Sequence, residues 1–499
     1  MSRNHAPAPG HNSAEAVRPE DQRLPIGTAF AYGFQHVLTM YGGIIAPPLI
    51  IGSAAGLSGP DIALLITSCL FVGGLATLLQ TLGIKWFGSQ LPLVQGTSFA
   101  SVATMLAIVS GGGGLPAVFG AVIAASLIGL LIAPFFAKII HFFPPVVTGV
   151  VITTIGLSLT PVAANWALGG NAKAPDYGSP ANIGLAALTL VVIMLLSKLG
   201  NAVISRLSIL LAIVIGTVVA AFLGMADFSK VGMGPIFELP RPFAFGMPTF
   251  EPAAIISMVI VILVILTETT ADILAVGEIA GTKVDSKRIA NGLRADMLSS
   301  AVAPVFNTFT QSAFAQNVGL VAVTGIKSRF AVAAGGGVLT LLGLLPILGR
   351  VVAAVPTPVL GGAGVVLFGT VAASGIRTLA RVDYKDNMNL IIVATSIAFG
   401  LIPVINKDFY GHFPTWFQVI FDSGISSAAI MAILLNLVFN VVKRGNPHDP
   451  SVFAAAPTRI IPIQVLECLE EGDRCENGKI LDKDGKEITV QEPNGAHGH

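Results

Sequence analysis

Long apolar stretches alternate with short polar loops over most of the chain. A helix needs about 20 apolar residues to cross a bilayer, and most of the stretches approach that length. Fourteen such windows lie near residues 26–50, 61–84, 91–110, 115–137, 145–165, 182–197, 207–225, 253–280, 289–306, 314–326, 330–353, 358–375, 389–405 and 415–442. The pattern predicts an all-α polytopic membrane protein with 14 transmembrane segments.

The two ends of the chain are polar. Residues 1–25 are rich in proline and lack an apolar stretch before a small-residue cleavage site, so we expect a disordered cytosolic tail rather than a signal peptide. Residues 443–499 form a second polar tail, which we also place in the cytosol. There Asn477-Gly478 and Asp484-Gly485 are turn signals beside short apolar runs, so a small β-hairpin is possible.

The charges of the loops test the number of windows. If the amino end is inside, the loops after even-numbered windows are cytosolic and should be rich in lysine and arginine. They hold Lys85, Lys138, Lys198, Arg206, Lys283, Lys287, Arg288, Lys327, Arg329, Arg377, Arg381, Lys385, Lys443 and Arg444, whereas the opposite loops hold Lys173, Lys230, Arg241, Arg350 and Lys407. A missed or extra crossing would reverse this asymmetry, so it favours 14 segments with both termini in the cytoplasm.

Composition narrows the function. The chain is 53% hydrophobic and 11% charged, with a formal net charge of +1. A soluble domain is about 25% charged, so an ordinary soluble enzyme, a disordered scaffold and a nucleic-acid-binding protein are excluded. The sequence also contains no His-Glu-x-x-His, no Gly-x-Ser-x-Gly and no His/Cys cluster with metal-ligand spacing. We therefore expect a protein that is not an enzyme and holds no metal.

Two of the windows are interrupted. The third contains Pro92 and Gly96, and the tenth begins with the polar pair Gln316-Asn317 followed by Gly319. They occupy equivalent places in two halves of seven windows, and an odd number of crossings inverts the second half relative to the first. Matched interruptions in inverted repeats indicate the midplane binding site of a transporter. The alternative is that the glycines only permit close helix packing.

Ionisable residues lie inside several windows. Glu268 and Asp272 are four residues apart and share a helix face. A carboxylate near the bilayer centre costs about 3 kcal/mol on insertion scales, so two on one face need a reason. They are either a hydrogen-bonded structural pair or a ligand acceptor with a proton-sensitive partner. For Asp296 the sequence leaves a functional and a structural role open. His36 lies inside the first window, where a lone histidine is often only a packed hydrogen-bond donor.

At these residues the sequence resembles the nucleobase–ascorbate transporter family, also called the xanthine/uracil permease family. The ten residues Gln316-Asn317-Val-Gly-Leu-Val-Ala-Val-Thr324-Gly325 are similar to the family signature. Four further segments match family motifs in the same order along the chain: Gln35-His36, Thr97-Ser98-Phe99, Glu268-Thr-Thr-Ala-Asp272 and Leu293-Arg-Ala-Asp296. The chain departs from the pattern at Ala271, where the family often has glycine.

The resemblance implies a fold of two inverted seven-helix repeats that form a core and a gate domain, usually as a homodimer in the cell (inner) membrane. The core would comprise residues 26–140 (helices 1–4) and 253–355 (helices 8–11). The gate would comprise residues 141–252 (helices 5–7) and 356–442 (helices 12–14). Helices 3 and 10 would be the interrupted ones.

The resemblance also implies roles for individual residues. Glu268 would accept hydrogen bonds from ring N–H groups, Gln316 would pair with the oxo/amide edge, and Phe99 would stack on the ring. Ser98 and Ala315 would complete the contacts with backbone amides, and Asn317 would tune affinity. Site support or proton coupling is implied for His36, Asp272, Asp296, Gln35 and Thr324.

The chemistry of these side chains agrees with such a ligand, because a planar base needs a carboxylate, a carboxamide and an apolar face. We expect a secondary active transporter that imports xanthine or urate with a proton as coupling ion and no cofactor. One alternative is a permease for uracil or another nucleobase. Another is an anion carrier of the sulfate/dicarboxylate type, which would place cationic or helix-dipole groups at the two interruptions.

Overall fold

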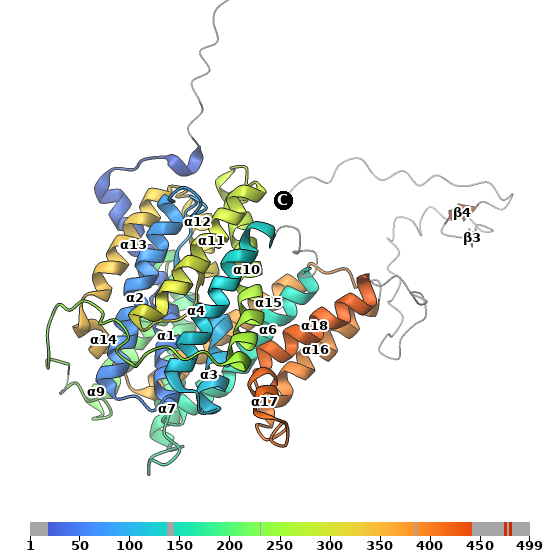
Figure 1. The fold of residues 1–499 in the computed structure, drawn as a ribbon. Coiled ribbons are helices and arrows are strands. Elements are labelled where there is room, and N and C mark those ends of the chain that lie inside the picture. The colour runs from blue at the N-terminus through green and yellow to red at the C-terminus, as the bar shows by residue number, and fades with distance from the viewer. Residues whose placement is uncertain are drawn as a thin grey trace, which may run out of the picture. The chain divides into compact units, whose positions relative to one another are not determined.

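A computed structural model describes residues 18–136, 144–229, 231–384, 387–441, 474–476 and 479–481. The chain divides into two compact units. The larger unit, residues 1–384 and 388–445, contains the helices (Figure 1). The smaller unit is formed by residues 385–387 and 446–499. In the smaller unit β3 (Arg474–Glu476) pairs antiparallel with β4 (Lys479–Leu481), in the tail where the sequence allows a small hairpin. The turn signals Asn477-Gly478 and Asp484-Gly485 lie outside the described residues.

The first half of the larger unit begins with the 3₁₀ turn η1 (Pro19–Asp21). Its other elements are α1 (Ile26–Ala54), α2 (Gly59–Leu82), β1 (Gln95–Thr97), η2 (Phe99–Ser101), α3 (Val102–Ser110), α4 (Gly114–Ile132), η3 (Ala133–Phe135), α6 (Pro145–Ala167), α7 (Pro180–Leu199), α8 (Ala202–Arg206) and α9 (Ser208–Phe222).

The second half follows the same plan. Its elements are α10 (Pro252–Ala280), α11 (Ser286–Val302), η5 (Ala303–Phe306), β2 (Gln311–Ala313), α12 (Ala315–Thr324), α13 (Arg329–Gly343), α14 (Pro346–Ala353), α15 (Thr357–Leu379), α16 (Asn387–Ile405), α17 (Thr415–Phe421), α18 (Gly424–Asn436) and the π turn η6 (Leu437–Val441).

Every predicted window contains a helix, and the chain is an all-α polytopic membrane protein. Among the described residues nine helices are long and apolar enough to cross a membrane, or ten if α13 and α14 form one bent span. That pair bends by 78° ahead of Pro346, which cannot continue the preceding helix. The other four windows hold the shorter helices α3, α9, α11 and α12, so the number of fourteen crossings stays a prediction.

The helices pack in two groups. In one group α1, α2 and α13 contact one another, and α4 packs against α10 and α11. In the other, α6 packs along α15 and also contacts α18, and these helices lie together at one side of Figure 1. Gly156 of α6 and Gly375 of α15 approach the partner helix so closely that a Cβ at either would collide with its backbone. The absence of side chains there lets the two helices touch along their length.

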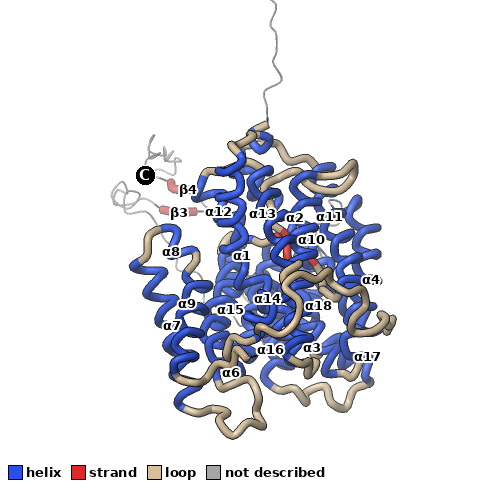
Figure 2. Tube along the Cα trace, turned by 90° about the vertical axis from the view of Figure 1, so that its left-hand side faces the viewer, coloured by secondary structure: helices blue, strands red, loops and turns tan. Residues whose placement is uncertain are grey.

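Two short strands join the halves at the centre of the helical unit. β1 and β2, red in Figure 2, pair antiparallel in the register Gln95 with Ala313, Gly96 with Ser312 and Thr97 with Gln311. Two flanking hydrogen bonds extend the ladder: Ser98 N donates to Thr310 O at 2.9 Å, and Phe314 N donates to Val94 O at 3.0 Å. Donors and acceptors exchange places between the repeats, as an internal two-fold axis requires.

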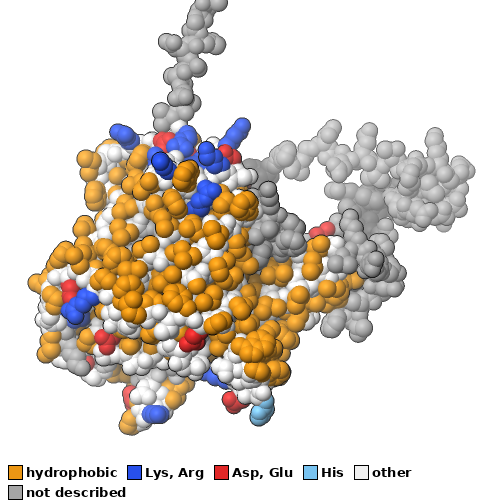
Figure 3. Space-filling view, in the orientation of Figure 1, with side chains coloured by type: hydrophobic (Ala, Val, Ile, Leu, Met, Phe, Trp, Pro, Cys, Tyr) orange, Lys and Arg blue, Asp and Glu red, His pale blue; other side chains and the backbone are white. Residues whose placement is uncertain are grey.

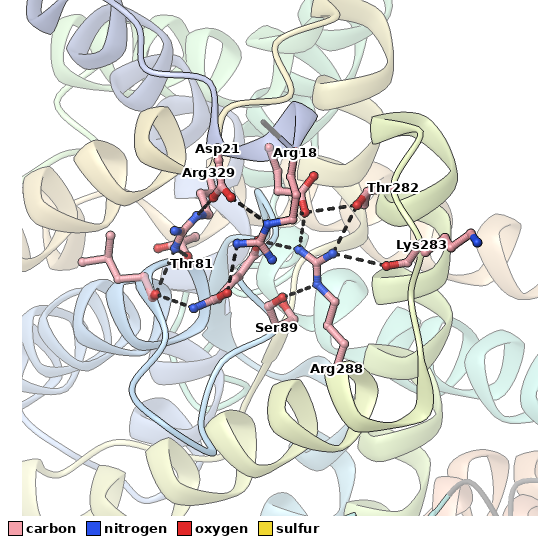
Figure 4. A network of polar contacts seen from close by, with 11 residues as sticks. Arg18, Asp21, Thr81, Ser89, Thr282, Lys283, Arg288 and Arg329 are labelled. Atoms are coloured by element: carbon pink, nitrogen blue, oxygen red, sulfur yellow. Dashed lines mark hydrogen bonds and ion pairs between the residues drawn. The ribbon is translucent and has the colours of Figure 1, made fainter. Parts of the chain in front are cut away.

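Residues 18–25 depart from the predicted disordered tail. Arg18–Gln22, called the N-terminal clasp below, lies across one end of α2, α11 and α13 (Figure 4). Glu20 is fully buried, and its Oε1 accepts hydrogen bonds from Arg288 Nη2 at 2.6 Å and Thr282 Oγ1 at 3.1 Å. The sequence gives no local sign of this order because Arg288 lies 268 residues further along the chain.

The clasp touches both repeats, since Arg18 Nη2 donates to Gln90 Oε1 of the first repeat at 3.3 Å. Asp21 accepts hydrogen bonds from Arg18 at 2.7 Å and from Arg329 of α13 at 2.6 Å. Arg288 also donates to the backbone carbonyls of Ser89 and Gln90, which precede β1, at 2.7 and 2.9 Å. The segment that leads into the first strand is thereby fixed by a side chain of the second repeat.

The surface has the character of a membrane protein. In Figure 3 apolar side chains cover the middle of the visible face, and lysine and arginine side chains gather at the end that carries the N-terminal segment. Many large apolar side chains are exposed, for example Phe222 at 87% and Leu131 at 74%. An exposed apolar belt of this extent is stable against lipid and would be unstable in water.

Candidate functional site

Hydroxyl groups hold the two strands from outside. The Thr77 hydroxyl of α2 accepts a hydrogen bond from Gln95 N at 2.9 Å and donates to Gln95 O at 3.2 Å. The Ser300 hydroxyl of α11 makes the same two bonds with Gln311, at 2.8 and 3.3 Å. Backbone groups must be satisfied internally within a membrane, and these side chains satisfy the edges that the three-residue strands leave open.

Sequence reasoning missed these hydroxyls. A usable signal is present, because a glutamine stands close to each interruption: Gln95 inside window three and Gln311 three residues before window ten. Aligning the two interruptions on these glutamines predicts equivalent neighbours in the preceding helices of each repeat.

Phe314 is a second residue that the prediction did not include. Its ring lies between Gly43 of α1 and Gly96 of β1, where a Cβ would come within 2.8 and 2.7 Å of ring atoms. Only glycine leaves room for the ring at both positions. Phe314 therefore fixes the distance between α1, the strand pair and the start of α12.

Glu268 and Asp272 of α10 have free carboxylates. Both side chains are half-buried, and neither makes a hydrogen bond or an ion pair with another group in the described part of the chain. α10 contacts η2, β2 and α12, so these acids stand beside both interrupted segments. Two unpaired, like-charged acids on one face are suited to accept N–H groups of a ligand.

Asp296 differs from these two acids. It is buried, and its carboxylate accepts hydrogen bonds from Thr269 Oγ1 at 2.5 Å and from Gln80 Nε2 at 3.4 Å. Gln80 in turn accepts from Ser89 N at 3.1 Å. Asp296 thus connects α10, α11 and α2, and has protein partners where Glu268 has none.

The adjacent residues Gln316 and Asn317 face different surroundings. Gln316 is exposed and lines a cavity of about 370 Å³ between α1, α9, α12 and α15. Asn317 is buried, and its Nδ2 donates to His36 Nδ1 and to His36 O, both at 3.0 Å. A side-chain amide that donates both hydrogens requires Nδ1 to be the acceptor, so the imidazole is neutral with its proton on Nε2. His36 and Asn317 thereby connect α1 to α12.

The remaining predicted residues are spread along the same elements. Phe99 follows β1 and is half-buried, with its ring 6.1 Å from that of Phe368 in an edge-on contact. Ser98 caps η2 and accepts from Ala100 N at 3.3 Å, and Ala315 is exposed at the first residue of α12.

Two of the predicted supporting residues make only local contacts. Gln35 is half-buried and its carbonyl accepts from Thr39 at 2.9 Å. Thr324 ends α12 and donates to Leu320 O at 2.8 Å, about 12 Å along the helix from Gln316. Among the residues that the structure describes, no group of three or more His, Cys, Asp or Glu is placed to hold a metal ion.

Most of the chain is similar in sequence to known proteins. The permease family described by the model Xan_ur_permease matches residues 27–408. The chain is 41% identical to the uric acid transporter UacT of Escherichia coli (strain K12), over 84% of this chain and 88% of that protein. It is 40% identical to the xanthine permease of Bacillus subtilis (strain 168), over 85% of this chain and 96% of that protein.

Solved structures match the fold. The transmembrane domain of the cyanobacterial bicarbonate transporter BicA aligns with a TM-score of 0.55 and 15% identity, over 83% of this chain and 99% of that chain. The murine anion transporter Slc26a9, in its inward-facing state, aligns with a TM-score of 0.57 and 14% identity, over 85% of this chain and 70% of that chain. At this identity the likeness concerns the architecture alone.

Proposed function

Because the chain belongs to the nucleobase–ascorbate transporter (xanthine/uracil permease) family, we propose that it is a secondary active transporter that imports a purine base, xanthine or urate. The names of the relatives support a purine, since those cited are a uric acid transporter and a xanthine permease. A uracil permease is the alternative within the family. Competition of labelled xanthine uptake by a panel of purines and pyrimidines separates the two.

The observation that carries this proposal is the free carboxylate of Glu268 beside the strand pair. Unpaired polar groups in a membrane interior are costly and need a functional reason. A ring N–H donor satisfies a carboxylate, Gln316 matches an oxo or amide edge, and Phe99 offers an apolar face. A small inorganic anion has no N–H group to donate to Glu268 or Asp272, which favours a base over the anion carriers that share the fold.

The two helix groups support alternating access. The core would comprise residues 26–140 and 253–355, and the gate residues 141–252 and 356–442. The cavity beside Gln316 has α1 and α12 of the core on one side and α9 and α15 of the gate on the other. Relative movement of the two groups would open and close this space to one side of the membrane.

The decisive experiment is Glu268→Gln, which keeps the shape of the side chain and removes its charge. We expect xanthine and urate uptake to be abolished while the protein remains in the membrane at wild-type amount. The matched control is Glu278→Gln, because Glu278 is an exposed acid on the same helix. Near-normal uptake by Glu268→Gln would remove Glu268 from the site and refute the proposal.

Proton symport is proposed from the same acids, since each can carry a proton in one state and release it in the other. We expect uptake to stop when the pH gradient is collapsed and to be insensitive to sodium. Sodium-dependent uptake that persists without a pH gradient would reverse this part of the proposal.

We further propose a homodimer in the inner membrane with both termini in the cytoplasm. The excess of lysine and arginine in the loops after even-numbered windows supports this orientation. A reporter fused after Lys443 should be cytosolic, whereas periplasmic exposure would require an odd number of crossings. Crosslinking in native membranes tests the dimer.

A further inference from the structure

The cavity beside Gln316 contains one charged side chain among the described residues that line it, Arg206. Most of the wall is apolar, with Phe314, Ile209 and Leu367 as examples. The two lining hydroxyls donate within their own helices, Thr39 to Gln35 O at 2.9 Å and Thr370 to Leu367 O at 2.7 Å. Gln316 and Arg206 are therefore the lining side chains that keep free donors for a ligand.

Arg206 stands apart from arginines of similar burial. The four other half-buried arginines in the described ranges each donate at least one hydrogen bond: Arg288 to Glu20, Arg294 to Asn291, Arg329 to Asp21 and Arg350 to Val231 O. Arg206 is half-buried as well, yet its guanidinium has no hydrogen bond and no ion pair within the described part of the chain.

Two ordinary explanations do not account for this arrangement. Arg206 is the last residue of α8, where a cation is favourable beside free carbonyls, but no described carbonyl accepts its guanidinium. An arginine at a membrane interface commonly extends its head group to water, but this one lines the mostly apolar cavity that Gln316 also lines. A guanidinium in an apolar cavity is stabilised by an anion, and its planar fork fits two acceptor atoms on one edge.

We propose that Arg206 is a second recognition point for the transported purine, which binds the anionic oxo edge of the base and selects anionic over neutral purines. The inference rests on the proposed function and specifies its substrate class. At about pH 6 urate is largely a monoanion, whereas xanthine is largely neutral. Glu268 would recognise the N–H groups that both bases carry, and Arg206 the charge that only one of them carries.

The position of Arg206 also indicates on which side of the central site the anionic base would meet it. It ends α8, two residues before α9 begins, in a connection of the predicted cytosolic set, whereas Gln316 stands in the first turn of α12 beside the strand pair. The anionic base would therefore meet Arg206 on the cytosolic side of the central site. The attraction would draw the substrate toward the side of release.

The test compares two substrates in one variant. In Arg206→Gln at about pH 6 we expect urate uptake to fall by about tenfold or more, the effect of losing one charge-assisted hydrogen bond, while xanthine uptake stays within about twofold of wild type. Arg206→Lys keeps the charge without the fork and should recover part of the urate uptake. Arg377→Gln is the matched control, since Arg377 is an exposed arginine of α15 with no partner among the described residues.

The outcomes separate this inference from the proposed function. An equal fall of both substrates in Arg206→Gln, or of neither, would overturn the role in selection. A lower apparent melting temperature of that variant with equal loss of both would assign Arg206 a structural role. Uptake of neither base by the wild-type protein would refute the proposed function, and this inference with it.

Discussion

Two charged regions of the molecule follow opposite rules. In the N-terminal clasp each buried or half-buried charge has a partner: Glu20 meets Arg288, and Asp21 meets Arg18 and Arg329. Around the strand pair, Glu268 and Asp272 have none within the described part of the chain. The groups of the clasp complete one another, whereas those of the site are left for a ligand to complete. Charges that hold the fold and charges that serve transport can thus be distinguished by their partners.

The difference has a physical basis. Both regions bear the cost of removing ions from water, but in the clasp the mutual attraction offsets that cost permanently. At the site only a bound ligand can offset the cost of removing Glu268 and Asp272 from water. Without the ligand, these two charges therefore lower the stability of the protein. The following predictions test this contrast, from the largest expected effect to the smallest.

Breaking the clasp should cost the most stability. Glu20 is fully buried, and Glu20→Gln leaves the half-buried Arg288 without its counter-charge. We expect a loss of about 3 kcal/mol in the free energy of unfolding. The apparent melting temperature of purified protein in detergent measures it, with the exposed residue Asp408 changed to Asn as the control. A variant that melts like wild type would mean that the clasp does not hold the two repeats together.

Neutralising Glu268 should change the stability in the opposite direction. Glu268→Gln removes one of two like charges that have no protein partner, so we expect the apparent stability of the empty protein to stay level or to rise by about 1 kcal/mol. The same melting experiment measures it. If this variant loses as much stability as Glu20→Gln, the distinction between the two regions fails.

The smallest effect concerns pH at the clasp. Burial alone would raise the pKa of Asp21, but the hydrogen bonds from Arg18 and Arg329 outweigh it and hold the pKa below its usual value. A carboxylate with a lowered pKa stabilises the fold above its unfolded pKa, and this contribution is lost as pH falls through the lowered value. The difference in melting temperature between wild type and Asp21→Asn should therefore be full at pH 6 and shrink below about pH 4. A difference independent of pH would exclude the carboxylate as its cause.

Local patterns in the sequence account for much of the fold. Apolar windows of about 20 residues locate the helices because a bilayer imposes that length. The interruptions at Gly96 and at Gln316-Asn317 are local features: the short helix α3 follows Gly96, and Gln316-Asn317 stand in the first turn of the short helix α12. The pairing of β3 with β4 likewise joins segments that are close neighbours in the sequence.

The contacts that the sequence did not reveal are long-range. Strands of three residues carry no periodic signal, and Glu20 meets Arg288 across 268 residues. For the same reason, only part of the site could be predicted from the sequence. The resemblance indicated Glu268 and Gln316, while Phe314, Thr77 and Ser300 are recognised only when the two repeats are brought together.

The strand pair has a consequence for how the protein is made. β1 begins at Gln95 and β2 at Gln311, so the ribosome adds 216 further residues (311 minus 95) before the partner strand exists. At about 5–20 residues per second this takes roughly 10–40 s, during which the first interrupted segment is already among lipids or insertion machinery. The unpaired backbone groups of β1 must therefore be kept from lipid by other parts of the chain or by the insertion machinery until β2 has been synthesised.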